Sequence, residues 1–198
     1  ENDMQKREFL KKTAVAAGVG FIVLSGGTTT SMTGADDPEK RRQINAAADS
    51  TLQRLYSSVK GSKALVDKSR GVLVFPAVLS AGFFVGGEYG EGALRVNGKT
   101  EGYYSTATGS LGLQIGAQSK AIIFLFMSSE SLDKLRNSSG WTAGADATVA
   151  VIKAGVNGAV DLNTVSNDVN VIVMTNEGLM AGVTIEGTKV TKLKTEES

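Results

Sequence analysis

Four carboxylates near glycines are the first candidates for chemistry in this sequence: Glu88, Glu91, Glu101 and Asp146. Carboxylates that meet in a fold can act as a general acid and base, or they can hold a hard cation. The chain has no histidine and no cysteine, so it lacks the commonest general base and any thiol chemistry. We therefore predict that the protein is not an enzyme and uses no cofactor and no metal. A hydrolase that works through carboxylates is a minor alternative.

A second candidate is Gly92–Thr100, GALRVNGKT, which nearly spells a phosphate-binding loop. Ala93 stands where that motif requires its first glycine, and Asn97-Gly98 favours the tight turn of a β-hairpin instead. The glycines at 82, 86, 87, 90 and 92 could form a backbone nest for an anion. We interpret them instead as sites where strands bend or backbones approach closely.

Positive charge is concentrated in Pro38–Arg70. This stretch holds eight basic and three acidic residues, whereas residues 71–198 hold nine basic and twelve acidic ones. Such a cluster predicts a local anionic partner, although it could also do no more than keep a helix surface soluble. The candidate lipid-binding residues are Lys40, Arg41, Arg42, Lys60, Lys63, Lys68 and Arg70.

The elements that would position these cations are two helices. Asp37 is a good N-cap and Pro38 suits the first helical position. An apolar stripe follows at Ile44, Ala48, Leu52, Leu55 and Val59. We predict that Gly61 ends this helix, that Ser62 caps a short second helix, and that Gly71 is the left-handed residue at its end. The pattern leaves open whether the first helix docks on a sheet or inserts into a bilayer.

The rest of the chain favours short strands. Pro76 is expected to end a strand that begins at Gly71, and Ala121–Met127 is apolar on both faces, as in a covered strand. We also predict a helix over Ser128–Asn137. Further strands are predicted at residues 110–118, 141–153, 169–175, 179–185 and 188–193. The predicted fold class is α+β: a small antiparallel β-barrel or strongly coiled sheet with about three helices packed on its outside.

The N-terminal residues 1–27 are typical of an export signal. Lys6, Arg7, Lys11 and Lys12 precede the apolar run Ala14–Leu24, which is too short to span a bilayer. Leu24-Ser25-Gly26-Gly27 resembles a bacterial lipobox in which Gly27 occupies the position of the lipidated cysteine. We interpret residues 1–3 as vector-derived, residues 28–36 as a flexible tether, residues 37–194 as one domain and residues 195–198 as a tail.

Four glycine-patterned blocks resemble the SYLF domain family, a lipid-binding module. They are Gly71–Gly92, Gly109–Gly116, Gly144–Asp146 and Glu177–Val183. The resemblance covers roughly residues 37–194. It implies a non-catalytic domain whose N-terminal helical region binds phosphoinositides.

Charge, signal and resemblance together predict the function. We expect a lipoprotein that is exported to the bacterial cell envelope, in the periplasm or at the outer membrane, and attached to a membrane surface by a lipid anchor at position Gly27. Its basic helical region would bind anionic phospholipids or phosphoinositides weakly, and no nucleic acid. The alternative is a structural envelope protein that recognises another protein through its glycine-rich sheet surface.

Overall fold

A computed structural model describes residues 37–82, 85–111, 119–161, 165–166, 168–180 and 182–194. Its α-helices over these residues are α2 (Pro38–Ser58), α3 (Ser62–Lys68) and α4 (Ser129–Asn137). A single 3₁₀ turn, η1, covers Val156–Gly158. None of the helices in the described part of the chain is long and apolar enough to cross a membrane.

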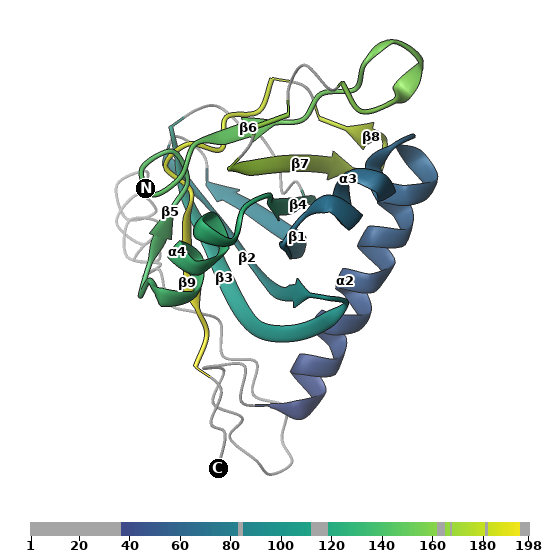
Figure 1. The fold of residues 1–198 in the computed structure, drawn as a ribbon. Helices are drawn as coiled ribbons and strands as arrows, with labels where there is room; N and C mark the ends of the chain where they lie inside the picture. The colour runs from purple at the N-terminus through teal and green to yellow at the C-terminus, as the bar shows by residue number, and fades with distance from the viewer. Residues whose placement is uncertain are drawn as a thin grey trace, which may run out of the picture. The chain divides into compact units, whose positions relative to one another are not determined.

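The strands form one sheet that curls strongly (Figure 1). Its strands are β1 (Gly71–Gly82), β2 (Val85–Val96), β3 (Lys99–Leu111), β4 (Ser119–Phe126), β5 (Trp141–Thr142), β6 (Val149–Val151), β7 (Val169–Thr175), β8 (Gly178–Leu179) and β9 (Lys189–Lys192). The order is β5-β9-β3-β2-β1-β4-β7-β6, and β8 pairs with β7. The predicted fold class is confirmed: α+β with a coiled, half-barrel sheet. The sheet is mixed, because β6 runs parallel to β7.

Each face of the sheet carries its own hydrophobic core. On one face, Val74 and Ile123 pack with Leu55 of α2 and Leu65 of α3. On the opposite face, Phe124 packs with α4 and with Trp141, whose ring meets it edge-on at 5.8 Å. In Figure 1, α2 and α4 lie on different sides of the curled sheet. Strand β4 contributes to both cores, which confirms the prediction from its unbroken apolar run.

Helix α2 docks on the sheet, and this answers the question that its sequence left open. The Asp37 side chain accepts a hydrogen bond from the Glu39 backbone N–H, as expected of an N-cap. Ile44, Ala48 and Leu55 are buried against β1 and β2. The apolar stripe therefore belongs to the protein core.

The second helix forms as predicted but is capped differently. Gly61 takes a left-handed conformation with φ of 82° and is itself the N-cap of α3. The buried Ser62 hydroxyl donates to the carbonyls of Leu55 and Val59 at the end of α2, so the prediction that it caps α3 is wrong. Gly71 is also not a left-handed cap, because α3 ends at the extended Ser69 and Gly71, two residues later, begins β1 without a positive φ.

Pro76 does not end β1, which continues to Gly82. The register of β1 with β2 shifts between Val74 and Ala77, so the proline lies in a bulge, where a missing N–H is tolerated. Gly90 and Gly92 of β2 lie against this bulge. A Cβ on Gly92 would overlap the carbonyl oxygen of Val74, and one on Gly90 would lie 2.8 Å from the carbonyl oxygen of Ala77. Close backbone approach, the predicted role of these glycines, is confirmed at both positions.

The remaining predictions vary in accuracy along the chain. The hairpin at Asn97-Gly98 is confirmed, with φ of 51° and 76° at the two residues. The helix over Ser128–Asn137 is confirmed too, with the Ser128 side chain as its cap. The strand predicted at residues 141–153 is broken into β5 and β6, because a turn with Gly144 at a φ of 84° separates them. The strand predicted at 179–185 shrinks to β8, and most of the one at 110–118 lies outside the described residues.

Candidate functional site

The seven candidate cations fall into two groups at opposite ends of α2. Lys40, Arg41 and Arg42 lie in its first turns, and we call them the α2 cations. Lys60, Lys63, Lys68 and Arg70 lie just before, in and just after α3, and we call them the α3 cations. A helix rises 1.5 Å per residue, so about 25 Å of α2 separates the two groups. One lipid head group therefore cannot contact both.

Carboxylates pair with two of the three α2 cations. Lys40 Nζ lies 2.8 Å from Glu91 Oε2 on the neighbouring sheet, and Arg42 pairs with Glu39 at 2.8 Å. Lys40 is half-buried by its contact. Among the described residues Arg41 forms no ion pair, so the α2 group keeps one uncompensated cation.

The α3 cations keep most of their charge uncompensated. Lys63 forms an ion pair with Asp67 at 2.7 Å, and hydrogen bonding to this carboxylate raises the pKa of the lysine. In the part of the chain that the structure describes, Lys60, Lys68 and Arg70 form no ion pair, and all three are exposed. Four cations with one carboxylate make this the more positive end of the helical region.

The packing of α3 determines which way these cations face. Leu65 and Val66 point into the core under the helix. Lys63 and Lys68 fall on the opposite, exposed half of its surface, because successive residues of a helix are rotated by about 100°. The Lys63 ammonium also lies 5.9 Å from the centre of the Tyr56 ring. The two lysines of α3 thus both present their charge to solvent, about 140° apart around the helix axis.

The structure does not gather the four carboxylates that could have done acid–base chemistry. Glu91 is paired with Lys40, and Glu88 forms a largely buried ion pair with Lys120 at 2.8 Å. Glu101 pairs with Arg136, and Asp146 accepts the backbone N–H of Thr142. Among the described residues, no three metal-ligating side chains come together. Each acid has a separate structural partner.

The nearly complete phosphate-loop motif, Gly92–Thr100, is the end of β2, its turn and the start of β3. A hairpin does not provide the strand, loop and helix that cradle phosphates in nucleotide-binding proteins. The hairpin that was predicted in place of a nucleotide-binding loop is confirmed. Gly27 and the lipobox-like segment lie outside the described residues.

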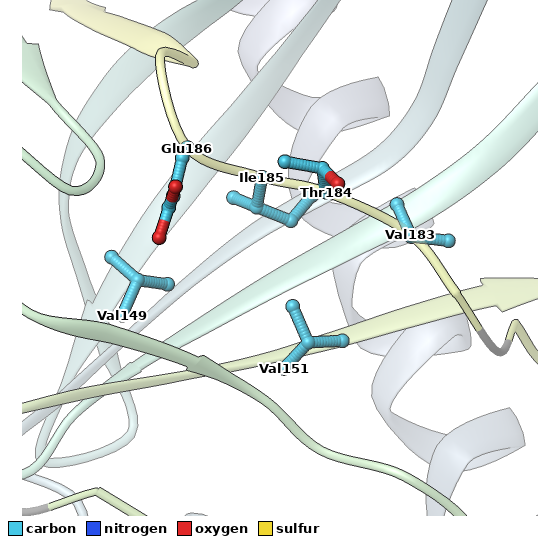
Figure 2. Close-up of a pocket in the computed structure, with 6 residues that line it drawn as sticks. All are labelled: Val149, Val151, Val183, Thr184, Ile185 and Glu186. Atoms are coloured by element: carbon cyan, nitrogen blue, oxygen red, sulfur yellow. The ribbon is translucent and has the colours of Figure 1, made fainter.

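A shallow cavity, which no sequence pattern indicated, opens beside the sheet edge (Figure 2). It has a volume of about 230 Å³ between β6 and the segment Val183–Glu186. Val149 and Val151 point from β6 toward that segment, and Glu186 points back toward Val149. The lining is mostly aliphatic with one carboxylate, which suits packing more than catalysis.

Comparison with known proteins finds a family match over part of the chain. Residues 107–198 match the family model Ysc84, described as "Las17-binding protein actin regulator", which is the SYLF family. Residues 107–198 carry a SYLF domain. The predicted resemblance is therefore confirmed over this part, and SYLF domains are known for lipid binding and actin regulation. A search of curated proteins finds no match to the chain.

The SYLF match begins inside β3, but the fold does not divide there. Strand β3 runs from Lys99 to Leu111, and it pairs with β2 along most of its length. β1 and β2, which precede the matched residues, stand between β3 and β4 in the sheet order. The basic helices α2 and α3 pack on this shared sheet. The SYLF residues and the candidate cations thus belong to one folded unit.

Proposed function

We propose that this protein is a non-catalytic lipid-binding domain of an exported bacterial envelope lipoprotein. It binds anionic lipids, phosphoinositides among them, through its basic N-terminal helical region. The observation that carries the proposal is the cluster of α3 cations: exposed, close in sequence and mostly without carboxylate partners. Membership in a family known for lipid binding supports it.

Of the seven candidate lipid-binding residues, the four α3 cations are the preferred contact with anionic lipid. Carboxylates already pair with Lys40 and Arg42, so a phosphate gains less there. Each basic residue near an anionic surface contributes about 1 kcal/mol, and three or four of them give a dissociation constant of about 1 mM. Such binding is weak and is lost in salt.

Weak binding of this size needs a second attachment for stable residence on a membrane. A lipid anchor at position 27 would provide it. The anchor would keep the domain near one bilayer. The α3 cations would then select anionic head groups, and the anchor would supply most of the attachment. The periplasm or the outer membrane is the proposed location.

The test is a titration of the full chain with a short-chain phosphoinositide, followed by residue-resolved NMR at two salt concentrations. Shifts should concentrate at residues 60–70 and shrink in the higher salt. Replacing the α3 cations with glutamine should weaken binding about tenfold or more, because most of the free charge is lost. Replacing the α2 cations with glutamine is the matched control and should weaken it less. Shifts confined to the sheet would favour a protein-recognition role instead, and no response to any anionic lipid would refute the proposal.

A further inference from the structure

Two large hydrophobic side chains lie exposed side by side on the sheet. Leu79 of β1 is 58% exposed and Tyr89 of β2 is 52% exposed. They are direct register partners in the antiparallel pair β1–β2, so their side chains share one face. Exposed Ala77 and Ala107 flank them on the same face. We call these four residues the Leu79 patch.

The Leu79 patch belongs to the face that carries α2. Side chains alternate along a strand, so Tyr89, Glu91 and Ala93 point the same way. Ala93 is buried in the core beneath α2, and Glu91 contacts Lys40 in the first turn of that helix. The patch is therefore the part of this face that extends beyond the N-terminal end of α2 and that no described helix covers.

The backbone beneath the patch has its pairing partners on both sides. Leu79 is paired with Ser119 of β4 and with Tyr89, and Tyr89 is paired in turn with Ala107 of β3. The Tyr89 hydroxyl donates a hydrogen bond to Glu91 at 3.0 Å. The surface thus offers apolar side chains without an open strand edge or an unpaired phenol. It can leave water without the cost of unpaired N–H and C=O groups.

The charges at the border of the patch favour an anionic neighbour. Lys40 compensates the carboxylate of Glu91, the nearest acid. Lys189 of β9 lies opposite Ala107 in register and is exposed, and Arg41 follows Lys40 in α2. The border therefore has more positive than negative charge.

Size distinguishes the possible occupants. A stable protein interface buries about 800 Å² on each partner. A leucine and a tyrosine that are each about half exposed offer much less than that, because even a fully buried aromatic side chain contributes about 150–250 Å². A small apolar patch with a paired backbone, an anchored tyrosine and a cationic border instead suits the interface of a bilayer, where amphipathic aromatic rings gather.

We propose that the Leu79 patch enters the head-group region of an anionic bilayer and is a second contact of the domain with the membrane. This inference rests on the proposed function and deepens it, because the ligand becomes a lipid surface and not an isolated head group. Leu79 and Tyr89 supply the apolar contact, and Arg41 and Lys189 lie beside the lipid phosphates.

The absence of cysteine from the chain makes a direct test possible. A full-length Leu79→Cys variant carrying an environment-sensitive fluorophore is mixed with vesicles of phosphatidylcholine and phosphatidylglycerol. The emission should shift to the blue, and lipids with a quencher in the acyl chain should quench it. The matched control is Glu177→Cys, at the exposed turn between β7 and β8. The emission of a label there should change neither with vesicles nor with the quencher lipids.

Co-sedimentation of the same samples separates the two proposals. Protein that sediments with vesicles while the label at 79 stays unquenched would overturn the inference and leave the proposed function standing. If the emission of the label at position 79 changes with protein concentration in the absence of lipid, the inference would be overturned in favour of self-association through the Leu79 patch. Failure to sediment with these vesicles would overturn the inference, and the proposed function would be refuted as well only if the short-chain phosphoinositide also caused no shifts. Leu79→Ser with Tyr89→Ser should reduce vesicle affinity about tenfold, but should leave shifts caused by a soluble short-chain phosphoinositide at residues 60–70 unchanged.

Discussion

At the scale of single residues, Gly92 shows how a close backbone contact can restrict a position to glycine. Its position against the bulge of β1 leaves no room for a Cβ beside the carbonyl of Val74. Gly92→Ala should therefore destabilise the protein by about 3 kcal/mol, as overpacking at a rigid contact does. Chemical denaturation monitored by circular dichroism measures the change.

Gly109 is the matched control for that experiment. It lies in β3, and nothing lies within 4 Å of where its Cβ would be. Gly109→Ala should leave the free energy of unfolding within about 1 kcal/mol of the wild type, or raise it by reducing the entropy of the unfolded chain. Equal destabilisation by the two substitutions would show that close backbone approach is not the reason for Gly92.

The phenol of Tyr104 makes the free energy of unfolding depend on pH in the alkaline range. Burial, with a smaller contribution from the charge of Glu101, raises the pKa of its phenol to about 12. The unfolded chain releases this proton near pH 10 and the folded chain only near 12, so stability falls as pH rises through this window. The loss should be about 2–3 kcal/mol for this group. Tyr104→Phe, which keeps the buried ring, should lose less stability than the wild type between pH 10 and 12 in parallel urea titrations. The same loss in both proteins would assign the pH dependence to other groups.

At the scale of elements, local signals predicted the parts whose conformation is decided locally. Asp37-Pro38 begins α2, Asn97-Gly98 turns the β2–β3 hairpin, and Ser128 caps α4. Pro76 was misread because a proline ends a strand only where its N–H is needed, and both neighbours of β1 shift register around it. That shift depends on tertiary pairing, which is not visible in a single segment.

Ser62 shows the same limit at a helix end. Its sequence position suits an N-cap, but its hydroxyl instead satisfies carbonyls at the end of α2, because the two helices meet at the left-handed Gly61. The angle between two helices depends on the sheet that both cover. Local propensity therefore predicted the two helices but not the contact between them.

At the scale of the whole molecule, the sequence could predict which residues are cationic but not which of them are neutralised. Glu91 stands far from Lys40 in sequence and pairs with it only because β2 passes under the first turn of α2. The exposure of Leu79 and Tyr89 was equally hidden, since Leu79 lies beyond the predicted end of its strand and Tyr89 lies in a stretch that was interpreted from its glycines alone. Both findings required the packed sheet, and together they reduce seven candidate cations to a preferred group of four and add an apolar contact.

The sheet order also predicts what the smallest folded unit is. A fragment of residues 107–198, the SYLF match, keeps β4, β7 and β6 on one side and β9 and β5 on the other. Three strands join these two groups, and the fragment lacks β1, β2 and most of β3. It would also expose Ile123, Leu125 and Ile172, which α2 and α3 cover in the intact core. We expect this fragment to show no cooperative thermal unfolding and poor dispersion of its amide NMR signals, whereas residues 37–198 should show both cooperativity and dispersion. A cooperative transition in the shorter fragment would mean that the matched residues fold without the basic helices, and the cations would then belong to an appended element instead of the domain itself.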